Sequence, residues 1–252
     1  MTYYANRANL WCRKGNFRRA IADADRAISL APQNSSAYCT RGSARLSLQD
    51  LPGAFADESA ALTRNPELAE AYALRGMVCC SLKRPYASLL DEAAALQRNC
   101  GLVDALIYRG GARHNLGDEA GAIADSTAAL KLRKGFFEAY LLRASAWAEK
   151  GDGVRALADA SEALRLAPGT AKGYSLRGYG RLATGNPAAA LPDLTTAIKL
   201  DPRSAQTYCL RACARWRLGD AAGAALDEAR ARSLDANHGG PYEGTWFPPR
   251  LP

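Results

Sequence analysis

The chain has 252 residues and a net charge of +8 at neutral pH, from 33 lysines and arginines against 25 aspartates and glutamates. No run approaches the ~18 consecutive apolar residues of a membrane-spanning helix, and the N-terminal MTYYANRANLWCRKG lacks the apolar core of a secretion signal. Seven cysteines, an odd number without a Cys-x-x-Cys pair, argue against a disulfide framework and favour a reducing compartment. We therefore expect a cytoplasmic protein with no membrane segment.

An arginine recurs every 34 residues along the whole chain, within similar local sequences such as AYCTRG at 37–42, AYALRG at 71–76 and GYSLRG at 173–178. An aspartate follows each arginine after sixteen residues. Self-similarity at a fixed period of this size indicates a repeat array. The two columns are Arg7, Arg41, Arg75, Arg109, Arg143, Arg177 and Arg211, and Asp23, Asp57, Asp91, Asp125, Asp159, Asp193 and Asp227.

The chain divides into seven blocks of 34 residues without an insertion. In the first block the pattern predicts helices over residues 2–14 and 16–30, and the same pair recurs in every block. Asn or Asp at position 16 of six blocks is typical of a helix N-cap, and proline at position 32 of four blocks ends the second helix. The predicted repeats are 1–34, 35–68, 69–102, 103–136, 137–170, 171–204 and 205–238, followed by a Gly/Pro/aromatic tail at 239–252.

This period, together with small residues at positions 8, 20 and 27 and proline at 32, resembles the tetratricopeptide repeat. Position 8 is Ala8, Gly42, Gly76, Gly110, Ala144, Gly178 and Ala212. The resemblance covers residues 1–238 and implies an all-α fold, a right-handed α-solenoid (superhelix) of seven helix-turn-helix repeats, with the first helix of each repeat on the concave face. It also implies a protein-binding role.

The aromatic side chains usual in this family at positions 11, 17 and 24 are mostly absent. Where position 24 is alanine, position 11 is tryptophan in two blocks, as in Trp11 and Ala24. We therefore expect positions 11 and 24 to compensate each other. For the charged residues at these positions, compensation predicts that Arg45 faces Glu58 and that Arg215 faces Glu228.

The arginine and aspartate columns predict ion pairs across each hairpin. Two antiparallel helices that turn near position 15 bring position 7 opposite position 23, and a turn near position 32 brings the same aspartate toward the next arginine. Asp23 is thus expected between Arg7 and Arg41. The planar guanidinium can bind a carboxylate through two nitrogens. The alternative is a ladder of arginines that holds an acidic ligand, but such a ladder would not need an aspartate in strict register.

The family resemblance places a candidate binding groove at positions 2, 5, 9, 12 and 13. Small and mildly apolar residues with an acidic edge favour an apolar or weakly basic peptide or helix as the partner. The lysine and asparagine with which some family members clamp a chaperone's C-terminal carboxylate are absent, apart from Asn9. The alternative is that these residues only fill space between helices. The predicted groove residues are Cys39, Ser43, Glu70, Ala73, Met77, Asp104, Ile107, Gly111, His114, Glu138, Leu141, Ser145 and Tyr179.

The sequence offers no arrangement of residues for catalysis. It contains two histidines and no phosphate-binding glycine loop. Cys209 and Cys213 share one helical face and could bind a soft metal, but no third ligand lies nearby, so we expect no metal or cofactor. We predict a non-enzymatic protein-interaction scaffold, of co-chaperone or assembly-adaptor type.

Two other functions stay open. The chain could be a regulatory subunit of a partner enzyme, which the sequence does not distinguish from a scaffold. A pI near 9.2 also raises the possibility of a nucleic-acid-binding helical repeat. Half of the net charge, +4, lies in the first 34 residues, and no continuous basic track follows, which makes nucleic acid an improbable partner.

Two local predictions concern a proline and the tail. Pro192 lies inside the second helix of the sixth repeat, where it lacks an N–H and clashes with the carbonyl of Ala188, so we expect that helix to kink or to start late. In the tail, we expect Trp246 and Phe247 to pack beside Leu226 and Leu234 on the last helix.

Overall fold

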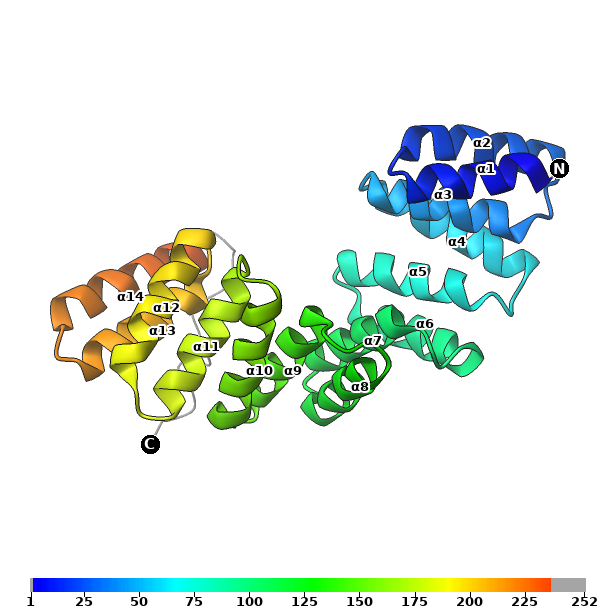
Figure 1. Cartoon of the computed structure of the whole chain (residues 1–252). Coiled ribbons are helices and arrows are strands. Elements are labelled where there is room, and N and C mark those ends of the chain that lie inside the picture. Colours follow the sequence, from blue (N-terminus) through cyan, green and yellow to red (C-terminus); the bar gives the residue numbers. More distant parts are fainter. Residues whose placement is uncertain (1, 237–252) are drawn as a thin grey trace. The chain divides into compact units, whose positions relative to one another are not determined.

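The computed structural model describes residues 2–236, so the predicted packing of Trp246 and Phe247 lies outside the described residues. Over this range the secondary structure is entirely α-helical (Figure 1). The helices are α1 (Thr2–Arg13), α2 (Phe17–Leu30), α3 (Ser35–Ser47), α4 (Leu51–Arg64), α5 (Ala69–Ser81), α6 (Pro85–Arg98), α7 (Val103–Asn115), α8 (Glu119–Leu132), α9 (Phe137–Glu149), α10 (Gly153–Leu166), α11 (Ala171–Ala183), α12 (Pro187–Leu200), α13 (Ala205–Arg217) and α14 (Ala221–Ala236).

The helices keep the period of the sequence. From α3 onward each odd-numbered helix begins 34 residues after the previous one, and each even-numbered helix begins at repeat position 17. The observed ends differ from the predicted ranges by one residue, because the residue at position 16 is the cap that precedes the second helix. The prediction of an all-α helical-repeat fold is confirmed.

Capping side chains start the helices. At position 16, Asn16 and Asp50 accept hydrogen bonds from the backbone N–H groups of Arg19 and Gly53, at 3.3 and 3.0 Å, and three other repeats have the same bond. A second cap, at position 34, was not predicted: the side chain of Asn34 accepts from the N–H of Ala37. Each cap satisfies a backbone donor that has no partner within its helix.

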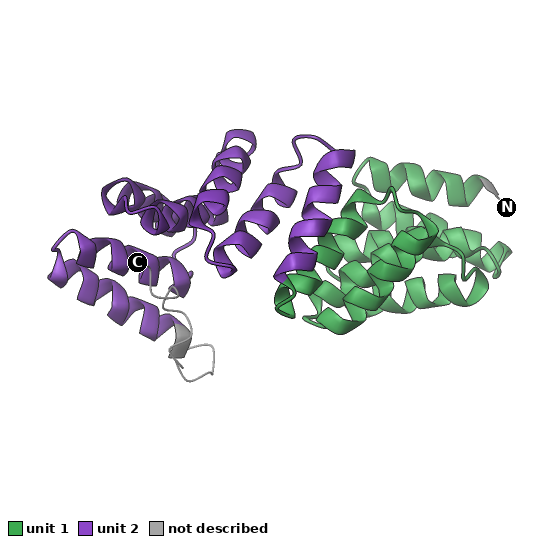
Figure 2. Ribbon diagram, turned by 90° about the horizontal axis from the view of Figure 1, so that it is seen from below, with its two compact units in different colours: residues 1–118 green, residues 119–252 purple. Residues whose placement is uncertain are grey.

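The chain forms two compact units, residues 1–118 and residues 119–252, coloured green and purple in Figure 2. Within each unit, every helix contacts the next one along the chain. Odd-numbered helices also contact the next odd-numbered helix, as α3 contacts α1 and α5, whereas no two even-numbered helices of the same described unit contact each other. The odd-numbered helices therefore form the inner layer of each unit and the even-numbered helices the outer layer.

Small side chains let the two layers approach closely. The alanines at positions 20 and 27 are fully buried in almost every repeat, as are Ala8 and Ala24. Position 8 is matched in size to position 24: alanine faces alanine in the first repeat, whereas Gly178 leaves room for Leu194, whose Cδ2 lies 2.6 Å from where a Cβ would stand. A smaller residue at position 8 thus leaves room for a larger one at position 24. The sequence analysis predicts such compensation between positions 11 and 24.

Of the two outcomes expected for Pro192, a kink or a late start, the structure excludes the late start. Helix α12 begins at Pro187, the usual position, and continues through Pro192 to Leu200, so it does not start late. A proline removes one backbone hydrogen bond, and α12 is held by its packing against both α11 and α13. The loss of one bond does not end the helix.

Candidate functional site

In repeats one, two, three, five, six and seven, a two-pronged ion pair joins the two helices of the hairpin. In α1 and α2, Arg7 Nε and Nη2 donate to the two carboxylate oxygens of Asp23 at 2.6 and 2.7 Å. The aspartates are buried; Asp57, for example, is 2% exposed. The pairs described in this way are Arg7–Asp23, Arg41–Asp57, Arg75–Asp91, Arg143–Asp159, Arg177–Asp193 and Arg211–Asp227.

The structure corrects the expectation that each aspartate also pairs with the arginine of the next repeat. The third guanidinium nitrogen reaches back to position 25 of the preceding repeat: Arg41 Nη1 donates to Asp25 at 2.6 Å, and Arg143 Nη1 donates to Thr127 Oγ1 at 3.1 Å. Residues two apart on a helix lie about 200° apart around its axis. Position 23 therefore faces its own hairpin partner, while position 25 faces the next repeat.

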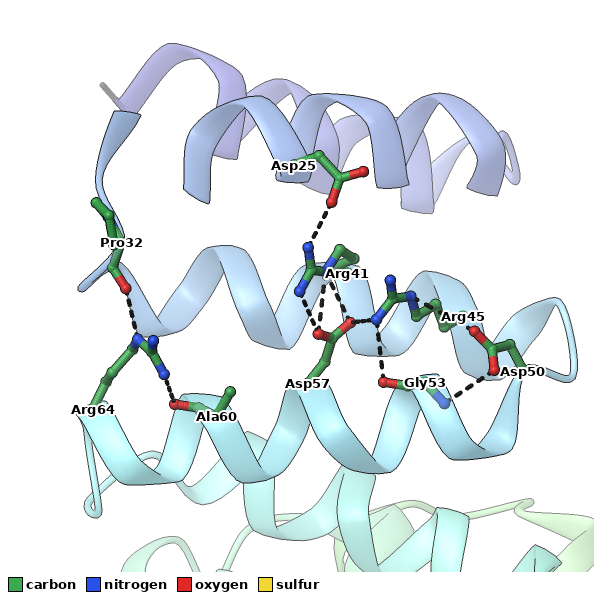
Figure 3. A network of polar contacts seen from close by, with 9 residues as sticks. All are labelled: Asp25, Pro32, Arg41, Arg45, Asp50, Gly53, Asp57, Ala60 and Arg64. Atoms are coloured by element: carbon green, nitrogen blue, oxygen red, sulfur yellow. Dashed lines mark hydrogen bonds and ion pairs between the residues drawn. The ribbon is translucent and has the colours of Figure 1, made fainter. Parts of the chain in front are cut away.

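The second guanidinium on the aspartate comes from position 11 of the same repeat. Arg45 Nη1 donates to Asp57 at 2.7 Å (Figure 3), and Arg215 Nη1 donates to Asp227 at 2.8 Å. The predicted pairing of Arg45 with Glu58 and of Arg215 with Glu228 was therefore wrong. Position 11 lies one turn beyond position 7, so both arginines reach the same carboxylate.

These bonds leave no arginine ladder for a ligand within the pairs described. Arg41 donates through Nε and both Nη atoms to Asp57 and Asp25, and its side chain is only 16% exposed. The hydrogen bond from Arg7 lowers the pKa of Asp23, and the bond to Asp91 raises the pKa of Arg75. Both partners stay charged, as a buried pair requires.

In repeats two and three, an arginine of the second helix bonds to the preceding repeat, a contact that the sequence analysis did not predict. Arg64 stacks 4.1 Å above the ring of Tyr38, and its Nε donates to the carbonyl of Pro32 in the preceding repeat at 2.6 Å (Figure 3). Arg98 repeats this arrangement over Tyr72. The available signal was position 30, which is arginine in these two repeats and leucine in the others.

In residues 1–118, the predicted groove residues lie on the inner helices α3, α5 and α7. Glu70 and Asp104, both at position 2, are exposed, while the smaller groove side chains are half-buried. This face therefore combines small, partly accessible side chains with exposed carboxylates. The half-buried residues are Cys39, Ser43, Ala73, Met77, Ile107, Gly111 and His114.

In residues 119–252, the predicted groove residues are mostly interior. Leu141, Ser145 and Tyr179 are 8, 6 and 7% exposed. Ser145 Oγ donates to the carbonyl of Leu141, and Tyr179 OH donates to the carbonyl of Ala148. Glu138 is half-buried. The three buried side chains pack inside the unit, which agrees with the space-filling alternative, so the candidate site narrows to the first unit.

Two further carboxyl groups lie buried between the helices of the first unit, near the predicted groove residues. Glu58 and Glu92 are both 0% exposed. The carboxyl oxygens of Glu92 have no hydrogen-bond partner among the described residues, and the polar group beside those of Glu58 is the Cys39 thiol, a weak donor. Burial raises the pKa of each to about 9. Sequence reasoning took Glu58 for a partner of Arg45; the signal it overlooked was a glutamate at position 24 opposite a glycine at position 8.

Other kinds of site find no support in the described part of the chain. No three His, Cys, Asp or Glu side chains among the described residues are grouped to hold a metal ion. Among the described helices, none has the length and apolarity to cross a membrane.

The family model of the tetratricopeptide repeat matches residues 7–69 and 176–238. The chain belongs to the tetratricopeptide repeat family. The two matched segments together make up half of its length, and the repeats between them keep the same period, Arg–Asp columns and helix boundaries. Comparison with curated protein sequences gives no match.

Solved structures of tetratricopeptide repeat proteins share the fold. YrrB, described as having an unusual peptide-binding site, is 22% identical with a TM-score of 0.60, over 71% of this chain and 92% of its own. A tetratricopeptide repeat protein from Parabacteroides merdae is 19% identical with a TM-score of 0.66, over 92% of both chains. The Cut9–Hcn1 structure gives a TM-score of 0.76 at 14% identity, over 93% of this chain and 46% of that one.

Proposed function

We propose that this tetratricopeptide repeat protein is a non-enzymatic scaffold that binds a peptide or helix of a partner protein on the inner helices of its first unit. The observation that carries the proposal is the character of that face. Its half-buried side chains, such as Ala73 and Met77, are small or flexible, and exposed carboxylates edge them. The arginines that could have reversed this charge are paired with aspartates behind the face.

Charge selects the kind of partner. In repeats two to four, positions 2, 5 and 9 contain no lysine or arginine, while position 2 supplies Glu70 and Asp104. An acidic edge around small side chains fits a helix or peptide that is apolar or weakly basic, and repels an acidic one. YrrB, which shares the fold, is itself described as a peptide-binding protein. The seven unbridged cysteines favour a cytoplasmic setting.

Site-specific photo-crosslinking tests the proposal. A benzophenone side chain at Ala73, on inner helix α5, should capture one defined partner in cells. The same group at Leu90, which is 72% exposed on outer helix α6, is the matched control and should not capture it. Met77→Arg should abolish the Ala73 product by adding bulk and positive charge to the face. Capture from Leu90 alone would place binding on the outer layer and contradict the proposal.

A further inference from the structure

Glu58 and Glu92 are the least satisfied polar groups in the first unit. Each carboxyl group lies over the glycine at position 8 of its own repeat: Glu58 Oε1 lies against Gly42, and Glu92 Oε1 lies 2.6 Å from where a Cβ of Gly76 would stand. Both carboxyl oxygens of Glu92 are buried without a hydrogen-bond partner in the described residues, and those of Glu58 have only the thiol of Cys39, a weak donor, beside them. A buried polar group without a partner is costly and calls for an explanation.

Packing does not explain why these residues are glutamates. In the sixth repeat, Leu194 occupies the same position over the same kind of glycine, Gly178, and is also 0% exposed. Leucine therefore fills this space in the same chain without an unsatisfied polar group. Glutamate in two consecutive repeats has to serve something other than the core.

Their surroundings connect both carboxyl groups to the groove. Glu58 lies beside the thiol of Cys39, a groove residue that also feels the charge of Glu70. Glu92 lies near Asp104 on α7 and near the Cys80 thiol on α5. In both repeats a buried carboxyl group therefore lies near a half-buried thiol of its own hairpin.

Among the described residues, no lysine or arginine forms a hydrogen bond with either carboxyl group. Arg75, whose charge acts on Glu58, donates to Asp91 through two nitrogens and to Ser59 Oγ through the third. The remaining charged neighbours are Asp57 beside Glu58, and Asp91 and Arg109 beside Glu92. Apart from the two arginines, every charged group that faces the glutamates carries the same sign as they would.

We propose that Glu58 and Glu92 recognise a partner segment that presents two lysine or arginine side chains to the inner face of the first unit. The inference rests on the proposed function and names the chemistry of its partner. In the free protein each carboxyl group is folded over its glycine in the neutral form. On binding, it turns toward the groove, loses its proton to solvent and forms an ion pair with the incoming cation, while Glu70 and Asp104 attract that cation from the edge.

This mechanism couples binding to proton release. A carboxyl group whose pKa is held near 9 by burial is protonated at pH 7.5, and a paired cation favours the ionised form. Formation of the complex should therefore release up to one proton per glutamate, and affinity should increase as pH rises toward 9. An exposed acidic groove with ordinary carboxylates would bind the same cations without releasing protons.

The experiment compares two synthetic amphipathic helices by isothermal titration calorimetry at pH 7.5. One peptide carries lysines on its polar face and the other has glutamine at the same places. Titrations in phosphate and in Tris, whose ionisation enthalpies differ, give the number of protons released. The wild-type chain should bind the lysine peptide at least tenfold more tightly than the glutamine peptide, and should release protons only with the lysine peptide.

Glu58→Leu combined with Glu92→Leu should abolish both the preference and the proton release, and circular dichroism verifies its fold. Glu67→Gln, which removes an exposed carboxylate of the same unit, is the matched control and should change neither. If Leu-for-Glu disturbs the fold, Glu58→Gln with Glu92→Gln keeps the shape and removes the charge.

The outcomes separate the two proposals. If both peptides bind equally, or if proton release survives in the double variant, the role of the glutamates is wrong and the scaffold function stands. If neither peptide binds and Ala73 captures no partner, the scaffold function fails and takes the inference with it.

Discussion

Arg75 and Asp91 show, at the scale of single residues, what the repeating columns contribute. The guanidinium joins α5 to α6 through two bonds of 2.8 and 2.7 Å and joins α5 to the preceding repeat through Ser59. A buried ion pair adds little net stability, because desolvation offsets the attraction. Its geometry nonetheless permits one alignment of the two helices, so we assign it the role of fixing the register of the hairpin.

A double-mutant cycle tests this role. Arg75→Ala and Asp91→Ala should each destabilise the chain, because the remaining partner would be a buried, unpaired charge. The cycle should show a coupling of ~0.5–3 kcal/mol in urea unfolding. Arg165 and Glu162, a solvent-accessible pair three residues apart on α10, serve as the control and should couple by under ~1 kcal/mol. Strict additivity for Arg75 and Asp91 would contradict the structural role.

The buried glutamates predict how stability changes with pH. The pKa of Glu58 and Glu92 is about 9 in the folded chain but near 4.5 when unfolded, so unfolding releases protons between these values. Their contribution to the free energy of unfolding is complete below pH 4.5 and decreases as pH rises to 9, by at most ~1.4 kcal/mol per pH unit for each group.

Urea midpoints measured from pH 5 to pH 8.5 test this trend. The wild-type midpoint should fall across the range, and the curve for Glu58→Leu combined with Glu92→Leu should be flatter and higher. Glu67→Gln should follow the wild type. A double variant with the wild-type slope would show that these carboxyl groups are not held protonated by the fold.

At the scale of the helix, the turn between the two helices of a repeat decides where the second one begins. Position 15 has a positive φ, 76° at Gly151, and the side chain at position 16 then caps the helix, as Asp152 accepts from the N–H of Arg155 at 3.0 Å. The third repeat departs from this pattern, with Lys83 at φ 55° and Arg84 in the capping position without a side-chain bond. Helix α6 therefore starts without a side-chain cap.

Removing one helix cap and adding another should change the free energy of unfolding in opposite directions. Asp152→Ala should lower the free energy of unfolding by ~0.5–2 kcal/mol, because the bond to the N–H of Arg155 is lost. Arg84→Asp should raise it by a similar amount, because the backbone at Arg84 has φ −110° and ψ 72°, close to that of the capping Asn186. Arg84→Ala separates the gain of a cap from the loss of the arginine. Equal stability of the Asp and Ala variants would contradict the prediction.

At the scale of the whole molecule, each unit is a stack in which helices touch only near neighbours, as expected for a repeat protein. The inner helices carry the candidate groove, and the outer helices bring the aspartates that pair with the inner arginines. Charge is distributed unevenly along this stack: the first repeat carries a net +4, and the inner face of repeats two to four is acidic at its edge.

This distribution predicts weak, salt-sensitive binding to nucleic acids. Arg13, Lys14, Arg18 and Arg19 are exposed in the first repeat and could contact phosphates, but no basic track continues from them along repeats two and three. Fluorescence anisotropy with labelled RNA and DNA should show affinity at low salt that decreases steeply with salt and does not depend on sequence. Tight, sequence-selective binding near physiological ionic strength would instead favour the nucleic-acid-binding alternative.

The sequence by itself determined the repeat length, the helix boundaries, the Arg7–Asp23 type of pair and the family. It could do so because these features depend on local spacing: a 34-residue period, a cap at position 16 and two positions that face each other across one short turn. The period and the facing pair recur seven times within one chain and the cap residue six times, so that the pattern stands out from chance.

The tertiary structure decided which side chains pair at positions for which the sequence offers more than one possible partner. Only the packed hairpin shows that Arg45 joins Arg41 on Asp57 and leaves Glu58 over Gly42, because rotation about the helix axis, not the sequence interval, sets the facing side. Burial likewise separated Glu70, which stays at the surface, from Tyr179, which packs inside. Such choices depend on how closely neighbouring helices approach, and no single position in the sequence encodes that distance.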